Sequence, residues 1–117
     1  MMRRFYALLP LLATLLIPIA AWADVWQDPE TKVNYEYTPG QSEAGVKKGT
    51  GWDSNDQAGC PEASGDIAIL SSFTIGGETY TVTEIRNYAF AHCNNLTSVK
   101  IPNTINFIGI GAFAECI

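Results

Sequence analysis

The chain has 117 residues, of which 47% are apolar, and it carries 12 acidic against 7 basic side chains. This length allows one small domain at most. The basic residues form no stripe, and phosphate recognition requires clustered Lys and Arg, so the composition argues against nucleic-acid binding.

The first 23 residues predict a secretory signal peptide. Two arginines precede a mostly apolar run over residues 5–19, and small residues follow at Ala21 and Ala23. A positive start, an apolar core and an A-x-A site define such a signal, so we expect export with cleavage before Asp24. The alternative is an uncleaved anchor, because the run approaches the roughly 20 residues that cross a bilayer. Pro18 near the end of the run favours cleavage, after which we expect no stable membrane span.

After position 23 the composition divides the chain into two parts. Residues 24–66 carry nine acidic side chains, three lysines and few apolar residues, whereas residues 67–117 carry three acidic and two basic side chains and are about half apolar. We predict an acidic, β-rich leader over 24–66 and a core-forming part over 67–117. Gly, Asp, Ser and Asn dominate residues 47–64, which we expect to form a polar insertion exposed to solvent.

Strands are predicted where polar and apolar residues alternate or where short apolar runs lie between turn residues. In the leader this applies to residues 32–37, and further along it applies to 66–70, 73–75 and 79–82. Gly76-Gly77 separates the last two segments. Because tight hairpin turns require positive φ, this pair predicts a hairpin.

A repeat of 23 residues occupies the end of the chain. Residues 85–93 overlay residues 108–116, with Ile, Ala, Phe, Ala and Cys recurring in place, and a predicted strand over 96–101 lies between the copies. A period of 20–29 residues is typical of a leucine-rich-repeat solenoid, in which each coil buries the same positions. The predicted inward-facing repeat core is Ile85, Ala89, Phe90, Cys93, Leu96, Val99, Ile101, Ile105, Ile108, Ala112, Phe113 and Cys116.

These residues resemble the BspA-like leucine-rich repeats of secreted bacterial surface proteins, whose pattern is roughly L-x-x-I-x-I-P-x-x-I-x-x-I-G-x-x-A-F-x-x-C. Residues 96–116 match the pattern with Val99 as a conservative replacement, and the earlier copy departs from it at Arg86, where the family usually has Gly. The resemblance implies a mostly β fold with short helical turns. It further implies a right-handed solenoid of 23-residue coils with one strand per coil, a bacterial cell-surface or extracellular location, and protein or host-surface binding.

Three cysteines in an exported chain allow more than one interpretation. Cys93 and Cys116 hold equivalent places in adjacent coils, where Cα atoms stand about 5 Å apart, within the range of a disulfide. We favour the other interpretation, in which both are buried apolar side chains of an interior ladder. Cys60 lies in the polar insertion without a repeat partner, so we expect it to be exposed, either free or paired with another chain.

The sequence predicts no catalytic, cofactor or metal site, and we expect no enzyme. His92 is the single histidine, and the next copy has Glu115 in its place, so no cleft is expected there. One histidine and three scattered cysteines do not supply a zinc site. The acidic run that begins at Asp53 lacks the Gly and Glu that a calcium loop needs at its sixth and twelfth positions.

Two functions remain as hypotheses. In the first, the protein is a noncatalytic, adhesin-like binder of extracellular or host-surface proteins, with Thr97, Ser98 and Lys100 as the exposed strand positions that contact the partner. In the second, it is the structural N-terminal cap and opening coils of a longer repeat protein whose functional region lies downstream. The second hypothesis predicts an exposed apolar end face and marginal stability, because solenoids need about three repeats.

Overall fold

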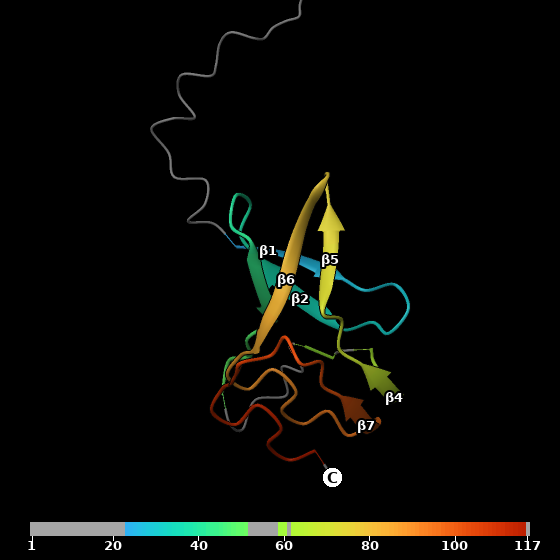
Figure 1. Cartoon of the computed structure of the whole chain (residues 1–117). Coiled ribbons are helices and arrows are strands. Elements are labelled where there is room, and N and C mark those ends of the chain that lie inside the picture. The colour runs from blue at the N-terminus through green and yellow to red at the C-terminus, as the bar shows by residue number, and fades with distance from the viewer. Residues whose placement is uncertain (1–22, 52–58, 61, 117) are drawn as a thin grey trace, which may run out of the picture.

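The computed structural model describes residues 23–51, 59–60 and 62–116 (Figure 1). The predicted signal peptide and the calcium-like run lie outside the described residues. Within them the fold is mostly β and contains no helix. The strands are β1 (Asp24–Gln27), β2 (Asn34–Tyr37), β3 (Glu43–Val46), β4 (Gly65–Ala68), β5 (Ser72–Ile75), β6 (Glu78–Ile85), β7 (Leu96–Lys100) and β8 (Phe107–Ile108).

The strands form two sheets. The larger sheet has six strands in the order β1-β2-β3-β6-β5, and β8 also pairs with β6. In it β2 is antiparallel to both β1 and β3, β6 is parallel to β3 and β8, and β5 is antiparallel to β6. The smaller sheet consists of β4 and β7 in parallel. In Figure 1 it lies on the same side of the larger sheet as the coils that follow β6.

The predicted strands are confirmed in place, with ends shifted by one to three residues. Residues 32–37 contain β2, 66–70 overlap β4, 73–75 fall within β5, and 79–82 fall within the longer β6. Gly76 and Gly77 have positive φ values of 60° and 85°, so the hairpin prediction is confirmed as well. Strand β1 was not predicted, because its four residues Asp-Val-Trp-Gln show no sustained alternation.

The leader and the core-forming part share one core. The parallel pairing of β3 with β6 joins the leader to the hairpin, and the predicted boundary between residues 66 and 67 falls inside β4. Both parts contribute to the largest fully buried side chains. These are Tyr35, Val33 and Val46 from the leader and Phe90, Ile85 and Val82 from the core-forming part. The leader, which has few apolar residues, thus buries those it has by pairing its strands with the sheet of the apolar-rich part.

The two repeat copies lie side by side at the spacing of the repeat. Glu84 and Ile85 of β6 pair with Phe107 and Ile108 of β8. Further along, the backbone N–H of Phe90 donates to the carbonyl of Ala112 at 2.7 Å. The Phe90 and Phe113 rings stack with their centroids 5.2 Å apart. The recurrence of side chains in the sequence therefore corresponds to direct neighbours in space.

The expected short helical turns are successive tight turns rather than helix. The N–H of Ala89 donates to the carbonyl of Arg86 at 3.1 Å, and other three-residue hydrogen bonds follow. Tyr88 and His92 interrupt them with φ values of 57° and 61°, and such positive values cannot belong to a right-handed helix. Gly111 and Glu115, 23 residues later, have φ values of 62° and 57°, so the second copy repeats this backbone.

Two members of the predicted inward-facing set are exposed instead. Ile101 and Ile108 keep 42% and 49% of their surface accessible. Within the described residues nothing packs over this side of the second copy, so these side chains lack the neighbouring coil that would cover them. Ile85, Ala89, Phe90, Cys93 and Ala112 are buried, and Leu96, Val99, Ile105, Phe113 and Cys116 are partly buried against the core.

Part of the described ends of the predicted polar insertion is buried, which corrects the expectation that all of it is exposed. Gly49, Gly59, Cys60 and Ala63 are buried, whereas Lys48, Thr50, Glu62 and Ser64 are exposed as expected. Gly49 donates its N–H to the Asn87 carbonyl at 2.9 Å, and Gly59 donates to the Ala89 carbonyl at 2.7 Å. At Gly49 an added Cβ would lie 2.5 Å from the Tyr88 carbonyl oxygen. Glycine is required at this position because the backbone of the insertion approaches the backbone of the first copy too closely for a side chain.

Candidate binding surface

The predicted contact residues lie on the exposed side of the β4–β7 sheet. Its register shifts between Gly65 and Asp66, and as a result Thr97 and Ser98 are both exposed although they are consecutive residues of β7. Such a bulge re-aims side chains that would otherwise alternate between faces. Lys100 is exposed at the end of the same strand. The structure therefore brings Thr97, Ser98 and Lys100 to one surface.

Asp66 of β4 joins this surface and organises it. The Thr97 and Ser98 hydroxyls both donate to its Oδ1, at 2.6 and 2.7 Å. These two hydrogen bonds, the one from Thr97 first, lower the pKa of the exposed Asp66 carboxyl. The surface offers a partner one carboxylate, two hydroxyl groups held in fixed positions, and the Lys100 ammonium. Sequence reasoning missed Asp66 because only the pairing of β4 with β7 places it beside Thr97.

A polar depression of about 280 Å³ borders this surface on the side of the leader. Glu30, Lys32, Glu62 and Asp66 bring mixed charges to its lining. It is open to solvent, and neither here nor elsewhere among the described residues do three His, Cys, Asp or Glu side chains come together in a way that could hold a metal ion. Its contribution is to extend the polar surface around Asp66.

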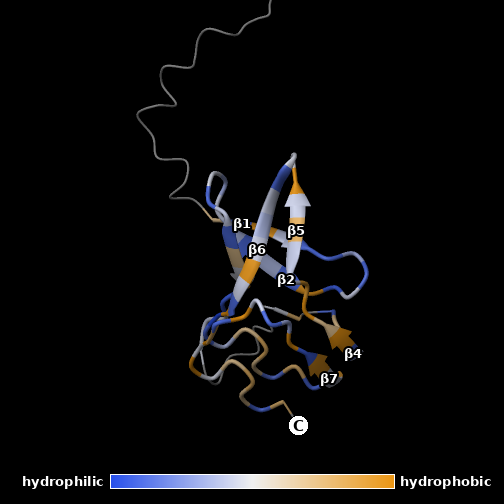
Figure 2. Ribbon diagram, in the orientation of Figure 1, coloured by the Kyte–Doolittle hydropathy of each residue, from blue (hydrophilic) through white to orange (hydrophobic). Residues whose placement is uncertain are grey.

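Strand β7 also borders an open groove of about 320 Å³, which Thr97 and Ser98 line together with apolar side chains. Leu96, Val99, Ile101, Phe113 and Cys116 contribute its apolar lining. The hydrophobic colouring in Figure 2 continues along the coils below the large sheet. Further exposed apolar side chains lie close by in the sequence, since Phe107 and Ile110 keep 52% and 70% of their surface accessible, beside Ile101 and Ile108. We call these four residues the apolar end face, and exposed apolar residues that gather in this way are candidates for a contact surface.

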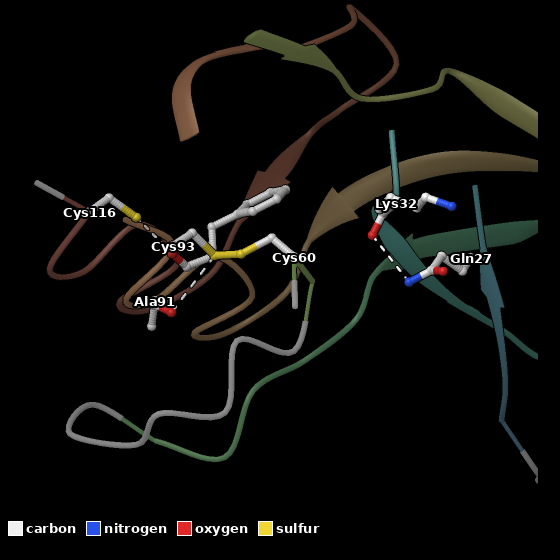
Figure 3. The surroundings of a disulfide bond; sticks show 7 residues. Gln27, Lys32, Cys60, Ala91, Cys93 and Cys116 are labelled. Carbon is white, nitrogen blue, oxygen red and sulfur yellow. Dashed lines mark hydrogen bonds between the residues drawn. A yellow bond between two sulfur atoms is a disulfide. The ribbon is translucent and has the colours of Figure 1, made fainter. Parts of the chain in front are cut away.

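Cys60 is buried and joined to Cys93 by a disulfide, so the expectation of an exposed Cys60 is wrong (Figure 3). The Cα atoms of the two cysteines are 6.3 Å apart. The Gly59 hydrogen bond to Ala89 places the insertion against the first copy, and that contact brings Cys60 to Cys93. No spacing in the sequence indicates it. Cys116 forms no disulfide and donates its thiol to the Phe90 carbonyl at 2.7 Å.

Arg86, the departure from the family pattern, links the leader to the first copy. Its guanidinium lies 3.2 Å from the Glu36 carboxylate of β2 and 3.3 Å from Glu84. Glu36 also accepts a hydrogen bond from the Lys48 N–H at 2.9 Å. A Cβ on Gly45 would lie 2.6 Å from Arg86 Nε, so the leader strand has room for this side chain because it carries a glycine there.

The remaining expectations concern His92 and the membrane. His92 is half-buried, and its backbone N–H donates to the Ala114 carbonyl at 2.8 Å. Across the described residues, no helix is long and apolar enough to span a bilayer.

The repeats match a known family model. The BspA type leucine-rich repeat region, described with six copies, matches residues 67–117. Residues 67–117 therefore belong to this family, and the resemblance drawn from the sequence is confirmed. None of the curated proteins compared with the chain matches it.

One solved structure supports the same assignment. It is a leucine rich cell surface protein from Faecalibacterium prausnitzii A2-165, and it superposes on this chain with a TM-score of 0.55 at 26% sequence identity. The match covers 80% of this chain and 21% of that chain. The present chain thus spans about a fifth of that protein, and the match extends beyond the repeats into the leader.

Proposed function

We propose that this is a cell-surface or secreted protein that binds other proteins without catalysis, in the manner of an adhesin. The observation that carries the proposal is the exposed, hydrogen-bonded group of Asp66, Thr97 and Ser98 on a parallel sheet built by a BspA-type repeat. Its similarity to a bacterial cell-surface protein supports the location. Partners would be extracellular or host-surface proteins, and a signal peptide cleaved before Asp24 would deliver the chain to them.

The proposed contact surface suits protein binding better than binding of a small molecule. The hydroxyls and the carboxylate lie on an open sheet, and the neighbouring depression is polar and open to solvent. Small ligands are usually held in concave, mostly apolar pockets. Repeat proteins instead spread binding over an extended face. Lys100 and Asp66 would select a partner by charge complementarity.

The binding test measures adhesion of the exported chain to cultured epithelial cells, with the bound protein quantified by an antibody. We expect the triple variant Thr97→Glu, Ser98→Glu, Lys100→Glu to lose binding by tenfold or more, since it places negative charge beside Asp66. Ser72→Glu, an exposed position on β5, is the matched control and keeps wild-type binding. Equal binding of the triple variant would remove these residues from the contact surface. A wild-type chain that binds no cells would remove the adhesin function.

A second candidate function is favoured by the apolar end face. In it, the chain is the N-terminal cap of a longer solenoid of 23-residue coils, and the next coil covers Ile101, Phe107, Ile108 and Ile110. Extending the chain with a second copy of residues 94–116 after Cys116 tests this. We expect a higher unfolding midpoint and less self-association than for the original chain. An unchanged midpoint would argue against stacking of coils on this face.

The processing step has its own measurement. Mass spectrometry of the exported chain is expected to find a first residue at Asp24. A chain that still carries Met1 would show that the segment is an uncleaved anchor.

A further inference from the structure

Three cysteines follow one another across neighbouring layers of the structure. Cys60 comes from the insertion, Cys93 from the first repeat copy and Cys116 from the second, and Figure 3 shows Cys93 between the other two. The disulfide joins Cys60 to Cys93. The Cys116 thiol reaches the carbonyl of Phe90, a residue of the same turn as Cys93. The free thiol of Cys116 and the bonded sulfur of Cys60 therefore lie on opposite sides of Cys93.

The backbone register places Cys116 directly beside Cys93. The N–H groups of Phe90 and His92 in the first copy donate to the carbonyls of Ala112 and Ala114 in the second copy. The two turns are therefore stacked in register at the 23-residue offset, which places residue 93 against residue 116. Hydrogen-bonded backbones stacked in this way stand about 4.8 Å apart, as neighbouring strands do. This separation lies within the roughly 4.4–6.8 Å of Cα distances found for disulfides, as does the 6.3 Å between Cys60 and Cys93.

The three positions differ in access to solvent. Cys60 and Cys93 are 3% and 2% exposed, whereas Cys116 is half-buried at the edge of the apolar groove. Cys116 is therefore the one of these three residues that is in contact with solvent. Reagents in solution have little access to the buried disulfide itself. The neighbouring thiol of the same chain is the nucleophile with the shortest approach.

We propose that the disulfide of this chain exchanges internally between two pairings, Cys60–Cys93 and Cys93–Cys116, with Cys93 common to both. The Cys116 thiolate attacks Cys93 Sγ, a Cys93–Cys116 bond forms, and the Cys60–Cys93 bond breaks. Cys60 leaves as a thiolate and takes up a proton, which balances the proton that Cys116 gave up. One disulfide and one thiol are present before and after, so the step needs no oxidant or reductant.

The two states fasten different parts of the molecule. The Cys60–Cys93 bond holds the insertion against the first repeat copy, and the Cys93–Cys116 bond would hold the two copies to each other. Exchange therefore replaces a covalent link between the leader and the first copy by a covalent link between the two copies. The redox state of the chain does not change. A partner or neighbouring coil that packs on the end face would favour one of these two states by contacting the surroundings of Cys116.

The first test measures which thiol is free in the wild-type chain. The full chain is incubated at pH 8, quenched with acid, labelled with N-ethylmaleimide in denaturant, and analysed by mass spectrometry of non-reduced peptides. We expect label on Cys116 and on Cys60, none on Cys93, and both disulfide-linked peptides. Minor protein states are populated at about 0.1–10%, so Cys60 label below about 0.1% of chains would overturn the proposal.

Two further measurements separate exchange within a chain from exchange between chains. The rate at which label appears on Cys60 is expected to be independent of protein concentration, and a rate proportional to concentration would overturn the internal step. In Cys116→Ser, Cys60 is expected to remain unlabelled. In Cys60→Ser incubated with oxidised glutathione, which takes up the two electrons, the Cys93–Cys116 disulfide is expected to form, and two free thiols in a folded Cys60→Ser chain after this treatment would also contradict the proposal. The wild-type measurement stands even where a variant does not fold.

Discussion

The six-stranded sheet and the second repeat copy bury apolar surface in different ways. In the sheet, rings from four strands pack on one another, with Trp26 stacked on Phe73 at 4.7 Å and Tyr37 against Tyr80 at 4.9 Å. The second copy buries one side against the first copy and leaves Ile108 and Ile110 exposed on the other. The comparison teaches that the leader strands close a core together with the β5–β6 hairpin, whereas the second copy is covered only on the side where the first copy stacks on it.

The largest effect is expected from truncating equivalent phenylalanines in the two copies. Phe90 is fully buried, so Phe90→Ala should lower the free energy of unfolding by about 3–5 kcal/mol. Phe113 is only partly buried, and Phe113→Ala should cost roughly half as much. Urea unfolding followed by circular dichroism measures both. Equal losses would show that the second copy is as well packed as the first.

The next effect concerns the core of the leader. The Tyr35 hydroxyl oxygen accepts a hydrogen bond from the Leu70 N–H at 2.9 Å. Tyr35→Phe leaves that N–H without its acceptor and should cost about 1–3 kcal/mol. Urea unfolding at neutral pH, with Tyr88→Phe as the half-buried control, measures the loss. A cost no greater than that of the control would show that this hydrogen bond does not hold β2 to the segment after β4.

Tyr35 also predicts how stability depends on alkaline pH. Burial raises the pKa of Tyr35 from 10.0 to about 12, because the phenolate is penalised in the core. The neutral form is favoured in the folded state, so this stability is complete below pH 10 and is lost as the pH rises from 10 towards 12. Unfolding midpoints measured from pH 8 to 12 should fall less steeply for Tyr35→Phe. Parallel curves for variant and wild type would contradict the assignment.

A smaller effect is expected where the insertion meets the first copy. In Gly49→Ala the new Cβ would lie 2.5 Å from the Tyr88 carbonyl oxygen, and we expect a loss of about 1–3 kcal/mol from overpacking. Gly51→Ala is the control two residues away, where an added Cβ meets nothing within 4 Å. Thermal unfolding compares the two. If both variants unfold at the same temperature, the insertion is not held closely against the repeat.

The smallest effect on stability, and the clearest on association, is expected at the end face. Ile110 is 70% exposed, so Ile110→Asp should change the free energy of unfolding by less than about 0.5 kcal/mol. It should nevertheless reduce self-association measured by light scattering, because it places a charge in the apolar end face. Unchanged scattering would show that this face does not drive contact between chains.

Particular residues show how far the sequence reaches. Gly76-Gly77 predicts its hairpin because the φ requirement is local, and the recurrence of Phe90 as Phe113 predicts stacking because identical coils bury identical positions. Thr97, Ser98 and Lys100 are placed on the exposed surface by the strand pattern, whereas Asp66 is not, since its role depends on a bulge in the β4–β7 register. Ile101 and Ile108 are misplaced because the pattern describes a coil with neighbours on both sides.

The sequence by itself determined the repeat, its family and most of the strands, since each depends on residues close together or on a fixed spacing. Only the tertiary structure decided that β3 joins the leader to the repeats and that Cys60 is bonded to Cys93. Both depend on segments that are distant in the chain and have no common pattern. Close to the disulfide, Gly49 and Gly59 let the insertion approach the first copy closely enough to donate hydrogen bonds to Asn87 and Ala89.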